Sequence, residues 1–379
     1  MHNKKKFTAM AAFVAVAALA MGACGSSEAE SEAPAASTGD SSEALATAAA
    51  NVKAWTSLDA AKFPMPTESF DAGKGKIAVI AGGFVAPVHA EQAKVAATAV
   101  KAIGWDLMGP YDGEFSPAVQ GGYIDQAVQE KADAVVLVAI DVNSVKSSVD
   151  RALKAGVTVT CTMCDSGAAY RAAGVIDVSV DFTQQGEYLG WYLIDKSKGK
   201  AKILNTVEPA APQTVKRAEG LTSVIESNCA DCTVESLTIP AADSTQAGPP
   251  QWTAFLSANP SGFTDAVAYY DGLSQSMLAT VKQTGREDID INGYDADVAI
   301  VEVLRSGDAP FGATVGEPYE FASWGAVDLA ARTKAKVALW ESTNLPNVLV
   351  TKDNAADYEP YLAPQGDWKA EFQSMWSGS

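Results

Sequence analysis

The chain has 379 residues, of which 28 are basic and 46 acidic, so its formal net charge is −18. A chain this negative is poorly suited to bind nucleic acid, and it offers no basic surface for docking on a membrane. Its length exceeds that of one ordinary hydrophobic core, which predicts two domains.

The first 23 residues have the features of an export signal. Lys4, Lys5 and Lys6 precede an apolar run, Phe7–Met21, that is too short and too rich in small residues to be a transmembrane helix. The run leads into Gly-Ala-Cys24, which resembles the lipobox of bacterial lipoproteins, whose cysteine is diacylated and becomes the first residue of the mature chain. We therefore expect a lipoprotein signal peptide over 1–23, lipidation at Cys24, and a protein held on the outer face of the cell membrane by its lipid alone. The alternative is an ordinary signal peptide cleaved nearby, with an incidental cysteine.

Two segments without a predicted core follow the signal. Residues 24–45 are rich in Ser, Glu, Ala, Gly and Thr and predict a flexible tether. Residues 46–75 include Trp55, Phe63 and two prolines, and we expect them to lie along the surface as an extended arm.

From Lys76 onward, short runs rich in Val, Ile and Ala alternate with longer segments of helical period, a pattern typical of βαβ units and parallel sheets. Strands are predicted at 76–81, 105–108, 134–140, 157–162, 176–180, 202–207, 233–239, 266–270, 289–294 and 312–315. Helices are predicted at 90–103, 117–131, 145–154, 184–196, 213–227, 273–284, 298–305 and 321–333. These strands are too many for one modest sheet, and no repeat is present. The prediction is an α/β fold with two doubly wound parallel sheets.

Ligands of open α/β sheets bind at the carboxyl ends of the strands, so the residues that follow each strand are candidates for a binding site. Carboxylates and aromatic side chains recur at these positions. They are Phe84, His89, Asp112, Asp141, Asp165, Asp181, Tyr270, Asp271, Tyr294, Asp295 and Glu317. Aspartate is also common in turns and as a helix cap, so the set indicates a site only if the strand ends converge.

Several segments carry a family resemblance. They include KIAVIA at Lys76–Ala81, KRAEG at Lys216–Gly220, INGYD at Ile291–Asp295 and ATVGE at Ala313–Glu317. In order and approximate spacing they resemble the type I periplasmic binding proteins, in particular the sugar-binding, ribose-binding-protein-like branch that serves ATP-binding-cassette importers. The resemblance covers about residues 76–352.

The resemblance implies two α/β lobes joined by a hinge of three crossings, with the ligand held in the cleft between them. The first lobe would comprise 76–180 and a returning helix near 318–340. The second would comprise 181–317 and a strand near 347–352. Residues 353–379 would form a tail with a short amphipathic helix, whose apolar face is Trp368, Phe372, Met375 and Trp376.

The resemblance also implies which residues contact the ligand. It places Asp165, Arg217, Asp271 and Asp295 on the polar edge of the ligand, and we add Phe84, His89, Tyr270 and Glu317 as contacts. Carboxylates accept hydroxyl hydrogen bonds, a guanidinium donates them, and an aromatic ring covers the C–H face of a sugar.

The chain also departs from the family. Glu317 stands where many relatives have glutamine, Tyr270 replaces a frequent asparagine, and His89 replaces a frequent aromatic residue. Ser166 stands where relatives that bind ribose have arginine, and together these departures argue against ribose. The acids would also suit an amine-bearing ligand, so a sugar, a polyol and an amino sugar all remain candidates.

Structural alternatives remain for single residues. Arg217 could be a solvated helix charge, Asp295 a cap, and His89 an ordinary residue at a helix start. Enzymatic chemistry has little support. His89 is the only histidine after the signal, and no glycine-rich phosphate-binding motif follows a strand. Paired carboxylates could serve a glycosidase, but relatives of this pattern bind without reacting. We therefore predict no enzyme activity, no cofactor and no metal site.

Two Cys-x-x-Cys pairs, Cys161 with Cys164 and Cys229 with Cys232, also need an explanation. A four-cysteine zinc site brings its pairs together across about 12–20 residues, whereas 64 residues separate these pairs, and the resemblance places them in different lobes. Export favours oxidation, so we expect two local disulfides. A thiol oxidoreductase is the alternative, although no helix N-terminus follows the first pair to activate a thiolate.

Taken together, the sequence predicts a monomeric, extracytoplasmic solute-binding protein that delivers a small hydroxylated ligand to an ATP-binding-cassette permease. The main alternative is a sensory receptor subunit, which would present the same ligand-closed form to a transmembrane signalling protein.

Overall fold

The computed structural model describes residues 41–164, 167–359 and 362–378. Two sheets organise these residues, a five-stranded sheet of order β2-β1-β3-β4-β5 and a six-stranded sheet of order β11-β10-β9-β8-β6-β7. Strand pairs are parallel throughout both sheets except for β10 with β11. The predicted α/β class with two parallel sheets is confirmed.

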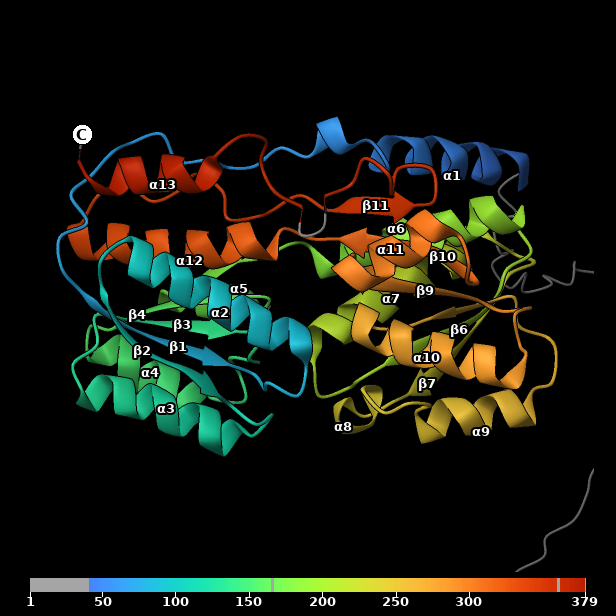
Figure 1. Ribbon diagram of the computed structural model, residues 1–379, viewed down its shortest axis with the longest axis horizontal. Helices are drawn as coiled ribbons and strands as arrows, with labels where there is room; N and C mark the ends of the chain where they lie inside the picture. Colours follow the sequence, from blue (N-terminus) through green and yellow to red (C-terminus); the bar gives the residue numbers. More distant parts are fainter. Residues whose placement is uncertain (1–40, 165–166, 360–361, 379) are drawn as a thin grey trace, which may run out of the picture. The chain divides into compact units, whose positions relative to one another are not determined.

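The first sheet is covered by helices on both faces (Figure 1). Its strands are β1 (Lys76–Ala81), β2 (Asp106–Asp112), β3 (Ala134–Val138), β4 (Thr158–Thr162) and β5 (Ile176–Val178). Helices α2 (Pro87–Ala102) and α12 (Tyr319–Ala335) pack on one face, and α3 (Pro117–Gln129) and α4 (Lys146–Lys154) on the other. The short α5 (Gly167–Ala173) precedes β5, so a helix begins three residues after Cys164, and the prediction that none follows the first cysteine pair is wrong. Four of its seven residues are alanine, which favours helix strongly.

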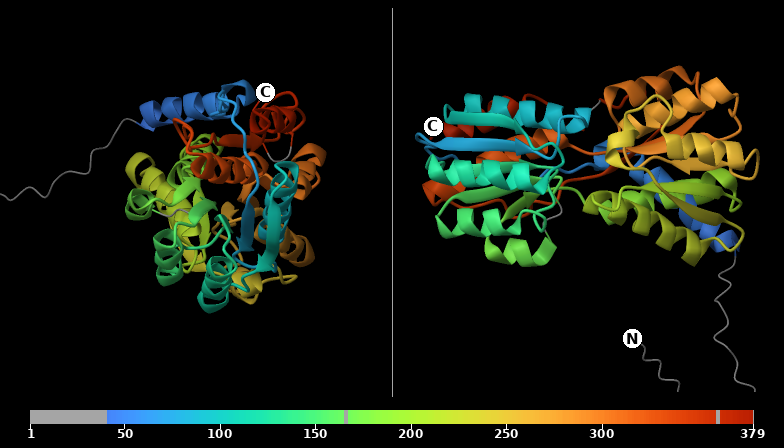
Figure 2. Two further views of the ribbon diagram at one scale, coloured as in Figure 1. Left: turned by 90° about the vertical axis from the view of Figure 1, so that its left-hand side faces the viewer. Right: turned by 90° about the horizontal axis from the view of Figure 1, so that it is seen from below.

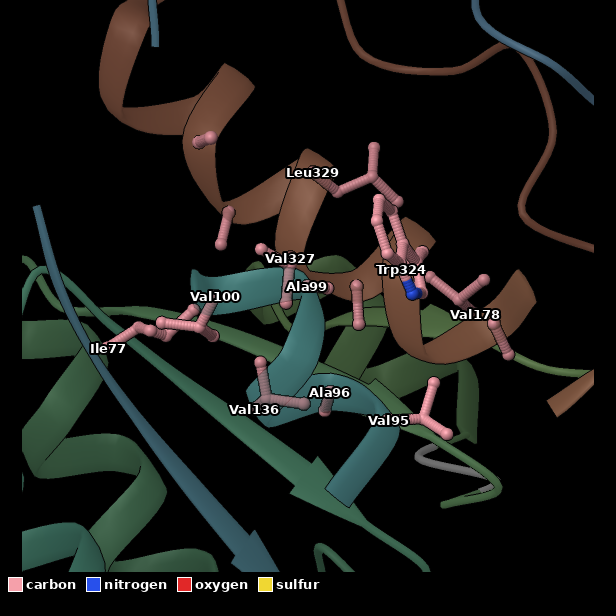
Figure 3. Close-up of a cluster of buried hydrophobic side chains, with 14 of the residues drawn as sticks. Ile77, Val95, Ala96, Ala99, Val100, Val136, Val178, Trp324, Val327 and Leu329 are labelled. Carbon is pink, nitrogen blue, oxygen red and sulfur yellow. The ribbon is translucent and has the colours of Figure 1, made fainter. Parts of the chain in front are cut away.

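Burial on both faces explains why these strands are continuous apolar runs. Successive side chains of a strand point to opposite faces. Accordingly, Ile77 and Val79 of β1 pack into the core beneath α2 and α12, whereas Ala78 and Ile80 pack into the core beneath α3 and α4. Figure 3 shows the first of these cores, with Ile77 among side chains of α2 and α12.

The second sheet repeats this arrangement. Its strands are β6 (Lys202–Val207), β7 (Thr233–Thr238), β8 (Asp265–Val267), β9 (Asp290–Asp295), β10 (Phe311–Gly316) and β11 (Val348–Thr351). The helices are α6 (Phe182–Ser197), α7 (Pro212–Asn228), the short α8 (Ala241–Ser244), α9 (Pro250–Ala258), α10 (Asp271–Thr284) and α11 (Val298–Ser306). Leu193 of α6 and Leu221 of α7 share one core with Ile203 of β6, and Met277 of α10 and Trp252 of α9 share another with Ile291 of β9.

We call the first sheet with its helices (76–178 and 319–335) the first lobe, and the second sheet with its helices (182–316 and 348–351) the second lobe. Three connections join them, at 179–181, 317–318 and 336–347 (Figure 2). Two of these lie side by side, because the backbone N–H of Leu345 donates to the carbonyl of Ser179, and Ser179 forms a bridge with Asn344.

The segment before the first strand differs from the prediction. A helix, α1 (Ser41–Trp55), replaces the end of the expected tether and the start of the expected extended arm. Leu45, Ala48, Val52 and Trp55 recur at helical spacing and pack against the second lobe, where the Trp55 ring stacks on Tyr188 with centroids 4.0 Å apart. Alanine favours helix strongly, and an apolar stripe of this period needs only a partner surface to be stable.

After α1 and a 3₁₀ turn, η1 (Leu58–Ala60), residues 61–75 form no further helix or strand apart from an isolated bridge at Asp71. This run packs along both lobes. Phe63 contacts the core of α11 and β11 in the second lobe and also stacks edge-on against Phe321 of α12 in the first. Residues 61–75 therefore cross both lobes without a helix or strand of their own.

The tail helix, α13 (Trp368–Trp376), packs against α12 in the first lobe. Its apolar face of Trp368, Phe372, Met375 and Trp376 is buried, as the spacing predicts. The buried carboxylate of Asp328 accepts a hydrogen bond of 2.7 Å from the Trp376 indole, which fixes the helix. In the described part of the chain, no helix combines the length and apolar character needed to cross a bilayer.

Candidate functional site

A cavity of about 500 Å³ lies at the carboxyl ends of strands from both sheets. The first lobe contributes loops after β1, β2, β3 and β4, and the second lobe contributes loops after β6, β7, β8 and β9. This is where open α/β sheets place their ligands, and the volume falls within the range of about 300–1,000 Å³ seen for ligand sites.

The structure brings together four of the predicted contacts. His89, Arg217, Tyr270 and Asp295 line the cavity. Phe84, Asp271 and Glu317 do not line it but lie close behind residues that do, as described below. Asp165 and Ser166 lie outside the described residues.

Arg217 is fully buried, at 2% exposure, so it is not a solvated surface charge. Its Nε donates to Gln185 Oε1 at 2.7 Å, and its Nη1 donates to the Tyr269 carbonyl at 2.9 Å. Nη2 donates to Asp295 Oδ1 at 3.0 Å and to Glu317 Oε2 at 3.3 Å. Four of its five N–H groups are therefore engaged within the protein.

Close packing of α6 against α7 sets the position of Arg217. Gly186 of α6 and Gly220 of α7 face the opposite helix, and a Cβ at either position would collide with the backbone of the other helix. The glycines let the two helices approach until Gln185 and Arg217 touch. The KRAEG segment thus supplies both the arginine and the glycine that allows its contact.

Two carboxylates share this guanidinium. Burial raises the pKa of Asp295 to about 8 although Arg217 opposes the shift, and burial also raises the pKa of Glu317. Two acids and one cation in a buried site favour retention of one proton, which leaves the group close to electrically neutral. Asp295 also has a φ of +107°, a conformation that L residues adopt rarely and that is often found at functional sites.

The hydrogen-bonded side chains around Arg217 reach all three connections between the lobes. Glu317 forms the second connection, where its Oε2 accepts from Gln185 Nε2 at 3.0 Å. Gln185 also donates to Asn347 of the third connection at 3.0 Å. Asn347 in turn donates to the backbone carbonyl of Asp181, in the first connection, at 3.1 Å. One chain of hydrogen bonds therefore leads from Asp295 in the cavity to each connection.

Asp271 is buried behind the cavity rather than in its wall. Its carboxylate accepts from the Thr314 hydroxyl at 3.1 Å and from the Asp297 backbone N–H at 3.1 Å. Burial raises its pKa well above the ordinary value. These bonds tie the start of α10 to β10 and to the turn after β9, and so support the loop that carries Asp295.

Phe84 supports the loop after β1. Its backbone N–H donates to Asp112 Oδ1 at 2.9 Å, and its ring packs against the first-lobe core. The two glycines before it are required by close approach. A Cβ at Gly82 would strike the carbonyl of Ala139, and one at Gly83 would overlap the Phe115 ring.

His89 faces the cavity from the first turn of α2, and its ring lies 5.4 Å from that of Phe115. Burial lowers its pKa to about 4, although the nearby Gly83 backbone opposes the shift, so the imidazole is neutral at neutral pH. Its Nδ1 has no hydrogen-bond partner among the described residues.

Two tyrosines form the opposite wall. The rings of Tyr269 and Tyr270 stack with centroids 5.3 Å apart. The Tyr270 hydroxyl shares a hydrogen bond of 2.9 Å with Ser244, whereas the Tyr269 hydroxyl is close to Ser244 without forming one. Burial raises the pKa of both tyrosines, that of Tyr270 to about 12, so both phenols are neutral donors.

Both cysteine pairs are disulfides in the structure. The sulfur atoms are 2.09 Å apart in Cys161–Cys164 and 1.99 Å apart in Cys229–Cys232. The first pair closes the loop after β4, and the residue between its cysteines that lines the cavity is Met163. No group of side chains suited to hold a metal ion occurs within the described ranges.

Several lining residues were not predicted as contacts. Met163 and Glu208 directly follow strands, so the strand-end rule applied evenly would have selected them. Asp141 was noted at a strand end but not chosen. Phe115 and Tyr269 carry no comparable signal, because their orientation depends on the Gly82–Gly83 turn and on the length of β8.

Comparisons with known proteins agree with this geometry. Residues 77–336, more than half of the chain, match the family described as periplasmic binding protein domain. No curated protein matches the chain.

Solved structures match over most of the chain. A solute-binding protein of an ABC transporter from Agrobacterium vitis, with bound allitol, is 17% identical and has a TM-score of 0.67 over 75% of this chain and 97% of that chain. One from Mycobacterium smegmatis, with bound glycerol, is 20% identical with a TM-score of 0.67 over 77% and 100%. A 5-methylthioribose transporter solute-binding protein from Thermotoga lettingae, in complex with 5-methylthioribose, is 15% identical with a TM-score of 0.68 over 79% and 96%.

At these identities the structural likeness establishes the fold, and the family match establishes kinship. The chain belongs to the periplasmic binding protein domain family and has its type I two-lobed fold, and this is a family of binding proteins rather than of enzymes.

Proposed function

We propose that the chain is the solute-binding protein of an ATP-binding-cassette importer and that it captures a small hydroxylated ligand, a sugar, polyol or amino sugar, in the cavity between the lobes. The observation that carries the proposal is the hydrogen-bonded chain from Asp295 in the cavity to all three connections. A ligand that contacts Asp295 or Arg217 thereby acts on the segments about which the lobes move, so binding can favour the closed form. The allitol, glycerol and 5-methylthioribose bound by similar structures support this ligand class.

Within this proposal, His89, Arg217, Tyr270 and Asp295 contact the ligand directly. Phe84, Asp271 and Glu317 act by holding those residues in place. Asp165, which follows the first disulfide, remains a proposed contact on the first-lobe side. Because Asp295 and Glu317 already pair with Arg217, an amino sugar would have to compete for their charge.

Thermal shift tests the ligand class. The protein beginning at Ser41 is heated with pentoses, hexoses, polyols and amino sugars, and a true ligand raises the midpoint progressively with its free concentration. Replacement of Asp295 by alanine should abolish that rise in a protein that still unfolds cooperatively. A response to amino acids or inorganic cations alone, with silence across all carbohydrates, would contradict the proposal.

The importer role is tested in cells. Loss of the protein should abolish uptake of the ligand found by thermal shift. The sensory alternative predicts that uptake persists while a transcriptional response to the ligand disappears.

The sequence up to Cys24 supports a lipid anchor on the outer face of the cell membrane, with the protein monomeric and otherwise clear of the bilayer. Replacement of Cys24 by serine should move the protein from the membrane fraction to the soluble extracytoplasmic fraction. Retention of the variant in the membrane fraction would contradict lipid anchoring.

A further inference from the structure

Much of the cavity wall is apolar. Half of its lining residues are alanine, proline, valine, methionine or phenylalanine, among them Phe115, Pro117 and Met163 in the first lobe and Pro212 and Pro240 in the second. A hydroxyl group pressed against such a surface loses its hydrogen bonds to water and gains none in return. The wall is therefore a poor match for a ligand that carries a hydroxyl on every carbon.

Most polar side chains of the wall are already engaged. Gln120 donates to the Gly82 carbonyl, and the Glu208 carboxylate accepts from the backbone N–H groups of Ala210 and Ala241. The Thr214 hydroxyl donates to the Glu208 carbonyl at 2.7 Å. Together with Arg217 and Ser244, which are bonded as described above, these groups hold the wall in shape and have little capacity left for a ligand.

Only a few polar groups of the wall lack a partner among the described residues. They are Nδ1 of His89, the hydroxyl of Tyr269, Oδ2 of Asp295, the side-chain amide of Gln213, Oε1 of Gln120 and Oδ2 of Asp141. His89 and Tyr269 are more than nine-tenths buried, so their unpaired atoms carry a desolvation cost that a ligand can relieve. This small set suits a ligand with a short run of hydroxyls at one end.

The wall also favours an uncharged ligand. Arg217 is neutralised by Asp295 and Glu317, and burial holds the pKa of Asp295 near 8, so that one proton is retained there at neutral pH. His89 is neutral, and Glu208 is compensated by backbone N–H groups. Among the described lining residues, the one carboxylate with neither a cationic partner nor two N–H donors is that of Asp141, which is half-buried and therefore screened by water.

We propose that the ligand is an uncharged sugar or polyol that bears an apolar substituent, such as a methyl, alkylthio or aryl group, and that the substituent lies against the apolar wall that includes Met163 and Phe115. This inference rests on the proposed function and narrows its ligand class. It disfavours both fully hydroxylated sugars and amino sugars.

The disulfide Cys161–Cys164 gives Met163 its place in this wall. Met163 has a φ of +57°, its N–H donates to the Ser179 hydroxyl at 3.1 Å, and its sulfur accepts from Gln92 at 2.7 Å. The disulfide joins two residues that are three positions apart in the chain. Together with these bonds, it holds the otherwise flexible Met163 side chain in one orientation. Met163 is therefore a specificity-determining residue of the proposed site.

Matched pairs of ligands test the proposal by isothermal titration of the protein beginning at Ser41. Ribose is compared with 5-methylthioribose, glucose and galactose with their phenyl and methyl glycosides, and glucose with glucosamine. We expect at least one substituted compound to bind about tenfold or more tightly than its parent, as expected for burial of two methylene-sized groups. Glucosamine should bind no more tightly than glucose.

Variants of the protein test whether the apolar wall causes the preference for substituted ligands. Met163→Ala should reduce several-fold the ratio of the affinity for a substituted compound to the affinity for its parent. Val298→Ala, at an exposed position of α11 that does not line the cavity, is the control and should change neither affinity. The wild-type ratio is itself decisive should Met163→Ala fail to fold.

The outcomes separate the two proposals. Parents that bind as tightly as every substituted partner, or glucosamine that binds more tightly than glucose, overturn this inference and leave the proposed function standing. Silence of all parents and all substituted compounds overturns both.

Discussion

Arg217 joins the ligand cavity to the connections between the lobes, and its burial makes it sensitive to change. Its two carboxylate partners, Asp295 and Glu317, are each 2% exposed. Loss of one partner from a buried ionic group leaves uncompensated charge, whereas loss of an exposed pair costs little because water replaces the contact.

The first prediction concerns this pairing. Arg217→Met should lower the free energy of unfolding by about 3–5 kcal/mol in urea titrations. Arg151→Met is the matched control, because Arg151 makes a comparable two-point contact with Asp125 at the surface, with side chains 55% and 32% exposed. The loss in free energy of unfolding should be clearly larger for Arg217→Met than for Arg151→Met. Equal losses would show that the buried ion pairs of Arg217 contribute no more to stability than an exposed pair.

The second prediction concerns pH. The pKa of Asp295 is about 8 in the folded protein, against about 3.9 when unfolded, so between these values the folded protein binds more protons than the unfolded chain. The contribution of Asp295 to the free energy of unfolding therefore falls as pH rises from 4 to 8. Asp295→Asn should flatten that slope by up to about 1.4 kcal/mol per pH unit, measured by urea unfolding at a series of pH values.

Asp288→Asn is the control for this measurement. The hydrogen bond from Arg286 lowers the pKa of the Asp288 carboxyl, so its own contribution to the pH dependence is confined to more acidic solution. It should leave the slope between pH 4 and 8 unchanged. An Asp295→Asn slope equal to that of the wild type would mean that Asp295 stays ionised throughout the interval.

At the residue scale, the sequence could select the right loops but not the orientation of each side chain. Tyr270 and Asp271 are adjacent after β8, yet Tyr270 lines the cavity and Asp271 is bonded behind it to Thr314. Likewise, the residues around Arg217 in the sequence do not show that it would contact Gln185. That contact depends on the close packing of α6 against α7.

At the element scale, α1 shows how composition can mislead. Its Ser, Glu and Ala content is typical of a linker, while its apolar positions have helical spacing, and only the partner surface on α6 decides between the two. The sheets were easier to predict, since strands buried on both faces are continuous apolar runs. Short elements such as α8 and the edge strand β11 have too few residues to show a period.

The third prediction tests the docking of α1. Trp55→Ala should lower the free energy of unfolding by about 1–3 kcal/mol, because it removes an aromatic stack and part of a buried surface. Hydrogen exchange should rise across Ser41–Trp55 and remain unchanged in β3, which lies in the other lobe. Lys53→Ala, an exposed change on the same helix, is the control. Unchanged exchange in the Trp55→Ala helix would show that the stack does not hold it.

The fourth prediction concerns the cysteines. The protein beginning at Ser41, alkylated without reduction, should carry no label on Cys161, Cys164, Cys229 or Cys232 in mass spectrometry, and should gain four labels after denaturation and reduction. Labelling of the unreduced, denatured protein at any of these positions would contradict the corresponding disulfide.

At the scale of the whole molecule, the lobes share more than three connections. Residues 56–75 lead from α1, which packs on the second lobe, to β1 in the first, and residues 352–367 lead from β11 in the second lobe to α13 in the first. These two segments are bonded to each other near their starts, since the Asn354 side-chain amide donates to the Thr56 carbonyl at 2.9 Å. The first segment is also bonded to α13, because the Phe70 N–H donates to the Met375 carbonyl at 2.8 Å. The family resemblance predicted the three central connections and could not predict these two, which lie outside the region it covers.

The fifth prediction follows from those added segments. A protein cut to the family-matched range, 77–336, loses β11, α13 and the arm, and with them the cover over Phe321 and Trp324. We expect it to aggregate, whereas the protein of residues 41–379 elutes as a monomer in size-exclusion chromatography. A soluble 77–336 protein that unfolds cooperatively would show that the arm and tail are dispensable.

The docking of α1 on the second lobe has a mechanical consequence. With Cys24 anchored as proposed, the described part of the chain meets the anchored segment at α1, which packs on the second lobe. In that arrangement the second lobe carries the attachment, so closure on a ligand changes the position of the first lobe relative to the anchored one.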